Sequence, residues 1–166
     1  MNSYLRITRH PYEEPYHLNL VIEASNGRLH GALEVYVSSQ DLSELPSSLR
    51  GFPSKNNETV RWELGSERPS DRSDYYFRLQ ALKVSAYGQC AIALRFNNNR
   101  PPPECEIVEF SIRAEPADIE RLTRLLDQFS GLEHSVLEWT VTDGQLHRVQ
   151  AAGRHSGPVF RTHGPD

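Results

Sequence analysis

Apolar and polar residues alternate through most of the first 115 positions, which is the pattern of half-buried β-strands. Two alternating runs, residues 16–22 and 29–37, flank Asn26-Gly27, a dipeptide that favours the type I′ turn of a hairpin. Further strands are predicted at residues 59–64, 75–84, 89–96 and 104–113. In the run 75–84 the apolar face shifts after Leu79, which predicts a β-bulge near Ala81.

Two helices are predicted between the strands. Residues 38–52 carry leucines and a phenylalanine at helical spacing, Ser38 and Asp41 fit a capping box, and Pro46 is expected to kink or restart the helix. Residues 116–130 begin at Pro116, which suits a first helical turn. The buried stripe of this second helix is expected to consist of Ile119, Leu122, Leu126 and Phe129. No internal repeat is apparent along the chain.

These elements predict an α+β fold. We expect a mainly antiparallel, curved sheet or a two-layer β-sandwich, with the C-terminal amphipathic helix packed on it and one short kinked helix. A chain of 166 residues is long enough for one core, so residues 1–131 are assigned to a single domain. Residues 132–150 are expected to add a β-hairpin around Asp143-Gly144, and residues 151–166 to form a frayed tail.

The two cysteines, Cys90 and Cys105, lie on the strands predicted at 89–96 and 104–113. If "NNNRPPP" is the connecting loop, matching the apolar faces places Cys90 opposite Phe110 and Cys105 opposite Arg95. The thiols then point to different faces, roughly 16 Å apart along the strand. A disulfide requires Cα atoms within about 7 Å, so neither a bridge nor a shared metal site is expected. A packed Cys90 is the favoured interpretation, and a nucleophilic cysteine would need His134 or His30 as its base.

Composition and charge exclude several classes of function. The formal net charge is −4, and no run of Lys and Arg offers a phosphate-binding surface, so we expect no nucleic-acid partner. The N-terminal residues lack an apolar leader segment, and no stretch approaches the roughly 18 apolar residues of a membrane span. The protein is therefore expected to be cytoplasmic, with no membrane partner and with reduced thiols.

Sequence motifs for catalysis and cofactor binding are missing. The seven histidines show no spacing that would place two imidazoles on one metal ion. No Gly-rich phosphate loop and no G-x-S-x-G motif is present. We therefore expect no metal and no cofactor, and the sequence favours a non-enzymatic protein while leaving the question open.

The order of the elements resembles a family of small bacterial proteins that includes the immunity proteins of wall-associated-protein toxins. The resemblance rests on D-L-x-x-L followed by L-x-x-F at residues 41–52, on an alternating strand that starts at Gly88, and on a closing strand with its amphipathic helix. It covers about residues 18–130. The resemblance implies an immunity-type protein that neutralises a toxin, and it implies no catalytic residues.

The sequence thus predicts a small protein-binding domain with a protein partner, possibly a basic toxin, since an acidic surface attracts a basic protein. The alternatives are a small hydrolase or transferase with an unidentified active site, and a homodimeric interaction module. The oligomeric state stays open. The candidate partner-binding residues are carboxylates that are expected to be solvated: Glu13, Glu14, Asp41, Glu44, Glu104 and Glu106.

Overall fold

The computed structural model describes residues 2–148 and confirms the α+β class, with antiparallel strands in two sheets and two helices. It adds an N-terminal strand and a short 3-10 turn that the sequence pattern did not predict. The strands are β1 (Tyr4–His10), β2 (His17–Ser25), β3 (His30–Ser38), β4 (Thr59–Gly65), β5 (Tyr76–Lys83), β6 (Cys90–Asn97), β7 (Ile107–Ala114), β8 (Val136–Thr140) and β9 (Gly144–His147). The helices are α1 (Ser39–Leu49), α2 (Pro116–Phe129) and the 3-10 turn η1 (Pro69–Asp71).

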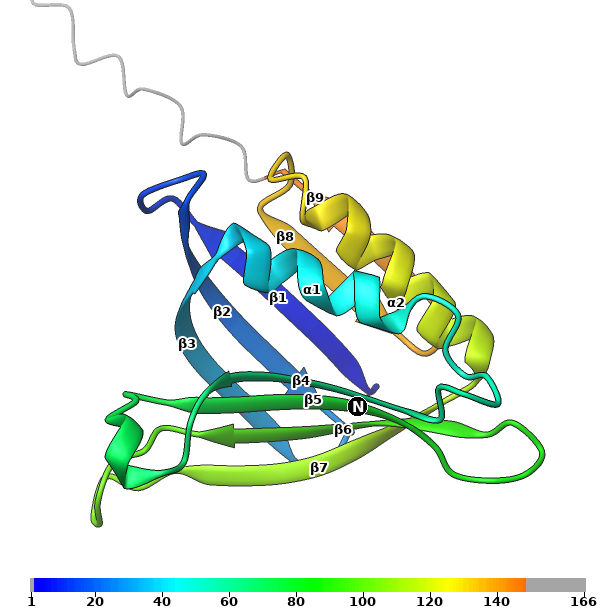
Figure 1. Ribbon diagram of the computed structural model, residues 1–166, viewed down its shortest axis with the longest axis horizontal. Helices are drawn as coiled ribbons and strands as arrows, with labels where there is room; N and C mark the ends of the chain where they lie inside the picture. The colour runs from blue at the N-terminus through cyan, green and yellow to red at the C-terminus, as the bar shows by residue number, and fades with distance from the viewer. Residues whose placement is uncertain (1, 149–166) are drawn as a thin grey trace, which may run out of the picture.

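The two sheets meet at a steep angle, and the helices lie beside each other on the inner side of the larger sheet (Figure 1). The larger sheet has the strand order β3-β2-β1-β8-β9, and the smaller one has the order β4-β5-β6-β7. The inner faces of both sheets and the apolar stripes of both helices form one core. Burial of this shared apolar surface is the main force that holds the layers together.

The fold consists of two equivalent halves that exchange their last strands. The first half runs β1-β2-β3-α1-β4, and the second runs β5-β6-β7-α2-β8. Strand β4 leaves the first half to pair with β5, and β8 leaves the second half to pair with β1. Both sheets therefore share one strand order, β3-β2-β1-β8 in one and β7-β6-β5-β4 in the other, and among the described strands only β9 has no counterpart.

The same duplication can be read in the sequence once the structure aligns the halves, so the expectation of no internal repeat was wrong. Each helix has an aspartate at its third position that closes a capping box. Each half also has a tryptophan, 21 residues after that aspartate, whose indole N–H donates to the aspartate's carbonyl, at 3.0 Å and 2.9 Å. At one constant offset the matched pairs are Asp41 and Asp118, Leu42 and Ile119, Leu45 and Leu122, Leu49 and Leu126, Phe52 and Phe129, and Trp62 and Trp139.

Both helices form as predicted at their N-termini and along their buried faces. In α1 the Ser38 hydroxyl accepts from the Asp41 N–H, and the Asp41 carboxylate accepts from the Ser38 N–H, which is the predicted capping box. The helix continues through Pro46, which is buried, to Leu49. In α2 the predicted stripe of Ile119, Leu122, Leu126 and Phe129 is fully buried.

Two predicted details of strand pairing were wrong. Cys90 lies opposite Ala114 rather than Phe110, because the connecting loop is longer than expected and β7 begins only at Ile107. The shift is an even number of residues, so the predicted inward and outward faces of both strands are kept. Strand β5 pairs without a break through Ala81, so the predicted bulge is absent, and Leu82 lies on the outer face of the sheet.

The segment after Gly131 contributes to the core. Strand β8 pairs with β1 in the middle of the larger sheet, and its Leu137 and Trp139 are fully buried. Strand β9 follows the turn at Asp143 and pairs with β8. The tail expected at residues 151–166 lies outside the described residues.

Candidate functional site

A hollow lined by two exposed tyrosines and two carboxylates lies where β3 runs into α1. It measures about 440 Å³, and its lining comes from the β1–β2 loop, the start of β2, the end of β3 and the first turn of α1. The lining residues, which we call the tyrosine hollow, are Tyr12, Glu13, His17, Tyr36, Val37, Ser38 and Asp41. The rings of Tyr12 and Tyr36 meet edge to face at 5.4 Å, and both side chains are about half exposed, at 55% and 53%.

Fixed local structure holds the hollow in place. The capping box orients Asp41 at its floor. On the edge of β3, the Tyr75 hydroxyl donates to the Tyr36 carbonyl at 2.7 Å and accepts from the Tyr36 N–H at 3.3 Å. A side chain thereby takes the place of a neighbouring strand, which both protects this edge and fixes the backbone beneath the Tyr36 ring.

A buried arginine anchors the loop that carries Tyr12 and Glu13. Arg9 is 9% exposed and forms an ion pair with Glu14. Its guanidinium also donates to the carbonyl of Leu132 at 2.9 Å and to that of His134 at 2.9 and 3.1 Å. Glu14 therefore has a structural partner, which distinguishes it from the solvated carboxylate that the sequence predicted.

Hydrogen bonds and burial shift the pKa of one carboxyl and of two tyrosines near the hollow. Hydrogen bonds from Asn19 and from the Tyr36 hydroxyl lower the pKa of Glu34, and the same hydrogen bond to Glu34 raises the pKa of Tyr36. Burial, together with the charges of Asp41 and Asp74, raises the pKa of Tyr75. At neutral pH the ionised carboxylate of Glu34 therefore lies beside the neutral hydroxyl of Tyr36.

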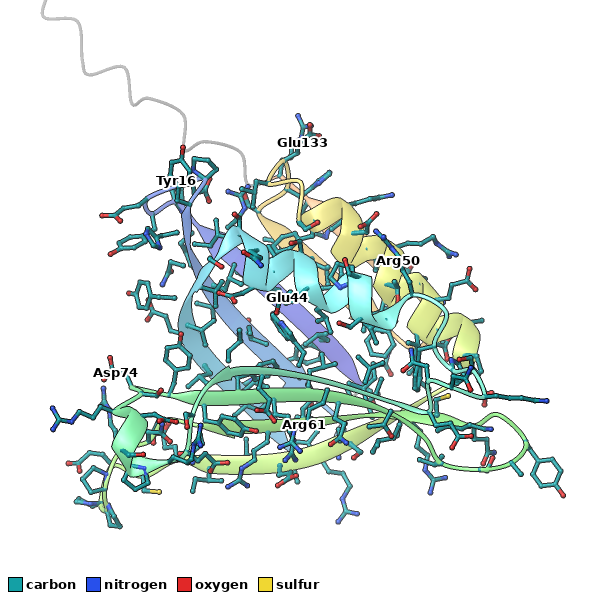
Figure 2. All side chains as sticks on the ribbon, in the orientation of Figure 1. Tyr16, Glu44, Arg50, Arg61, Asp74 and Glu133 are labelled. Atoms are coloured by element: carbon teal, nitrogen blue, oxygen red, sulfur yellow. The ribbon has the colours of Figure 1, made fainter. Side chains whose placement is uncertain are left out.

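These carboxylates also differ from the others in their partners. Among the described residues, most acidic side chains outside this region pair with an arginine or lysine. By contrast, no described cation forms an ion pair with the five carboxylates of this surface, which are Glu13, Glu34, Asp41, Glu44 and Asp74. In Figure 2, Tyr16 stands at the upper left and Asp74 at the lower left, with Glu44 on α1 between them in height. The result is a net negative, tyrosine-bearing surface.

The candidate carboxylates predicted from the sequence do not form one surface. Glu13 and Asp41 come together in the tyrosine hollow, and Glu44 lies exposed one turn further along α1. Asp41 is half-buried as a capping residue, so the prediction that it is solvated was wrong. Glu104 and Glu106 are exposed in the β6–β7 loop, and Glu106 lines a different hollow with His30 and Cys105.

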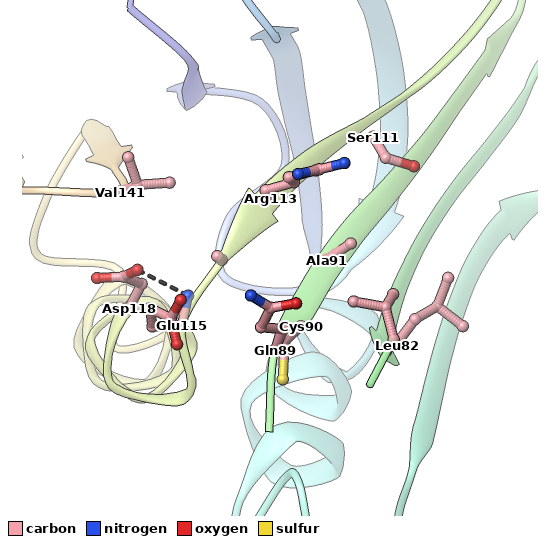
Figure 3. A pocket seen from close by; sticks show the side chains of 11 residues that line it. Leu82, Gln89, Cys90, Ala91, Ser111, Arg113, Glu115, Asp118 and Val141 are labelled. Atoms are coloured by element: carbon pink, nitrogen blue, oxygen red, sulfur yellow. Dashed lines mark hydrogen bonds between the residues drawn. The ribbon is translucent and has the colours of Figure 1, made fainter. Parts of the chain in front are cut away.

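A cavity of about 650 Å³ lies between the outer face of β5–β7 and the start of α2 (Figure 3). It contains Cys90 together with Arg113, Glu115 and Asp118, and none of the histidines within residues 2–148 lines it. Cys90 is 1% exposed, and burial together with the charge of Glu115 raises the pKa of its thiol. Its Sγ donates to the Gly88 carbonyl at 3.3 Å. A reactive thiolate needs the opposite conditions, so this site does not support a nucleophilic cysteine.

The tyrosine hollow and the Cys90 cavity occupy the same place in the two halves of the fold. Each is lined by the end of a third strand and by the capping box of the following helix. Tyr36 corresponds to Arg113, Ser38 to Glu115 and Asp41 to Asp118. The Cys90 cavity thus has a cation where the tyrosine hollow has Tyr36, and it has a second carboxylate where the hollow has Ser38.

Comparisons with known proteins leave the family open. No family model and no curated protein matches the chain. Among solved structures, the plant transcriptional regulator PBF-2 is similar over 78% of this chain and 76% of that chain, with a TM-score of 0.44 and 9% sequence identity. A similarity this low identifies neither a shared family nor a shared function.

Two further classes of site can be checked in residues 2–148. No group of three or more His, Cys, Asp or Glu side chains in this range is arranged to hold a metal ion. No helix in the same range is both long and apolar enough to cross a membrane.

Nothing in the sequence predicted that Tyr12 and Tyr36 lie in contact. The two lie in separate segments, and the strand order that brings them together depends on how β2 pairs with both neighbours. A tyrosine on the outer face of an alternating strand, next to the cap of the following helix, was the available clue.

Titration of the two thiols tests this account of the cysteines. Under native, non-reducing conditions we expect one thiol, Cys105, to react readily, because it is exposed while Cys90 is buried. Denaturant should release the second thiol. A protein with no free thiol in denaturant, or one whose Cys90 reacts as fast as Cys105, would contradict the assignment of Cys90 as a packed residue.

Proposed function

We propose that this protein is a non-enzymatic binding domain that captures a basic protein partner through the tyrosine hollow and the carboxylates around it. The observation that carries the proposal is the combination of half-exposed tyrosines with five carboxylates for which the described residues supply no cation. Tyrosine is enriched among the residues that dominate binding energy at protein interfaces. Unpaired carboxylates favour a partner that brings arginines or lysines.

The chemistry of the hollow indicates how a basic side chain would bind. An arginine or lysine entering the hollow beside the Tyr12–Tyr36 pair could lie against a ring face and reach the carboxylates of Glu13 and Asp41 at the same time. A cation over an aromatic ring contributes about 0.5–2 kcal/mol, and a carboxylate beside it adds a charge-assisted hydrogen bond. The fixed backbone below Tyr36 limits the conformational entropy lost on binding.

An immunity-type role, in which the basic partner is a toxin, is the specific form of this proposal. It is supported by the resemblance in the order of elements at residues 18–130 and by the net negative charge. The alternative of a cysteine-dependent hydrolase or transferase is less well supported, because no described histidine lines the Cys90 cavity and burial raises the pKa of the Cys90 thiol.

The test begins with capture of the products of neighbouring genes by the full chain, followed by binding kinetics at two salt concentrations. Tyr12→Ala combined with Tyr36→Ala is expected to weaken binding by about 10- to 100-fold, since both side chains project from the folded surface. Glu13→Lys with Glu44→Lys should slow association and reduce its salt dependence.

Tyr87→Ala is the matched control, because Tyr87 is 97% exposed but lies in the β5–β6 loop, away from the hollow. It should bind like the unmodified protein. If the tyrosine pair can be removed with no more effect than Tyr87, the hollow is not the binding site. If no neighbouring product binds while a small molecule is turned over, the proposal of a binding domain is wrong.

A further inference from the structure

The duplication of the fold points to a second interaction surface, at the outer edge of β4. In the larger sheet, β8 has β1 on one side and β9 on the other. Its counterpart β4 pairs with β5 on one side only, and no other backbone group among residues 2–148 bonds to its outer edge. If the two halves are superposed so that β8 lies on β4, then β9 lies along the outer edge of β4, where no described strand pairs. The position of β9 beside β8 therefore shows that the fold can accept a further strand at this edge.

The sequence of β4, Thr59–Gly65, is complementary to itself in one register. In an antiparallel pair, residues directly opposite each other project from the same face of the sheet. If two copies of β4 pair with Trp62 at the two-fold axis, each Arg61 lies opposite the Glu63 of the other copy. Val60 then lies opposite Leu64 on the buried face.

Neighbouring registers are unfavourable. Centring the pair on Arg61 or on Glu63 places like charges directly opposite each other. A shift of one residue would place the buried tryptophan face of one copy on the outer face of the other. Arg61 and Glu63 are both exposed on the outer face of the smaller sheet, the sheet on which Figure 2 labels Arg61.

Helix α1 indicates that the occupant is a folded strand rather than a lone peptide. In the other half, α2 covers β9, with the Leu125 side chain packed closely over Gly144 and Arg121 beside it. The matched positions on α1 are Ser48 and Glu44, which are exposed and polar. An isolated peptide strand beside β4 would not be covered by an apolar side chain of α1. The β4 strand of a second copy, by contrast, is already covered by its own sheet, its own Trp62 and its own α1.

We infer that this protein forms a two-fold homodimer by antiparallel pairing of β4 with β4 of a second copy, which makes a continuous eight-stranded sheet. The interface rests on backbone hydrogen bonds and on two reciprocal Arg61–Glu63 pairs. The pairing residues of β4 are not among those that line the tyrosine hollow, so loss of the dimer would leave the proposed binding at Tyr12 and Tyr36 intact. An edge strand with unpaired N–H and C=O groups commonly associates with a strand of another chain in this way.

Sedimentation velocity on the full chain over a concentration series tests the dimer. The unmodified protein is expected to shift from monomer to dimer. Arg61→Glu or Glu63→Arg alone should weaken the dimer by at least about tenfold, because each places like charges opposite each other on both sides of the axis. The double variant Arg61→Glu/Glu63→Arg should restore dimerisation, since it exchanges the charges and keeps them complementary.

The control is Arg100→Glu, which changes the same charge at an exposed position of the β6–β7 loop and should leave the dimer unchanged. A protein that is monomeric at every concentration overturns the inference. So does a dimer that survives both single reversals, or one that the double variant fails to restore.

Disulfide trapping tests the register directly. In a Cys105→Ser background, an Arg61→Cys chain mixed with a Glu63→Cys chain should form a cross-linked dimer under mild oxidation, because these positions are directly opposite. Either variant alone should cross-link much less. Equal cross-linking of Arg61→Cys with itself would overturn the register centred on Trp62.

Discussion

Replacing Trp139 by alanine is expected to lower the free energy of unfolding by about 3–5 kcal/mol, the usual loss for truncation of a fully buried tryptophan. Trp139 has no exposed surface, lies on β8 beside Leu5 of β1, and donates its indole N–H to the Asp118 carbonyl. It therefore joins the larger sheet to the first turn of α2. Urea unfolding followed by far-ultraviolet circular dichroism measures the change without relying on tryptophan fluorescence.

Two companion variants separate the causes. Trp139→Phe keeps most of the buried ring area but loses the donor, so it should cost less than the alanine variant, with about 1 kcal/mol from the hydrogen bond. Trp62→Ala, at the matched position of the other half, should cost about as much as Trp139→Ala, because Trp62 is 5% exposed and makes the same bond to Asp41. A loss below about 1 kcal/mol for Trp139→Ala would show that α2 and β8 are not packed as described.

Much of the fold follows from local patterns in the sequence. Alternation identified most of the strands, although not β1, because a half-buried strand has one buried face, as in β4, where Val60, Trp62 and Leu64 are buried between exposed neighbours. The capping box at Ser38 and Asp41 was predictable because it depends on residues three positions apart. These signals are local, and each element forms largely from its own residues.

Features that depend on distant contacts could not be read in the same way. The register of β6 and β7 depends on loop length, and several loop lengths keep the same faces inward. The exchange of β4 and β8 between the halves leaves no mark in the sequence of either strand. The duplication is hidden in the sequence because the two halves agree only at core and capping positions, while the polar positions between them differ.

The same reasoning explains why the candidate site was only partly predicted. Negative charge suggested Glu13 and Asp41 individually, but their common hollow exists because the β1–β2 loop folds over the end of β3. The tyrosine hollow and the Cys90 cavity show that matched backbone positions of the two halves carry different side chains. Where Tyr36 stands in one half, Arg113 stands in the other, with no ion-pair partner among the described residues, so one scaffold presents surfaces of different character.

The duplication also predicts that the two helices contribute comparably to stability. Leu122→Ala and Leu45→Ala, at matched and fully buried positions of α2 and α1, should each lower the free energy of unfolding by about 2–5 kcal/mol. Ala117→Ser, at an exposed position in the first turn of α2, should change it by less than about 1 kcal/mol. Urea unfolding of the three variants under one set of conditions provides the comparison. If Leu45→Ala is as mild as Ala117→Ser while Leu122→Ala is severe, only α2 supports the core, and the two halves are equivalent in topology but not in energy.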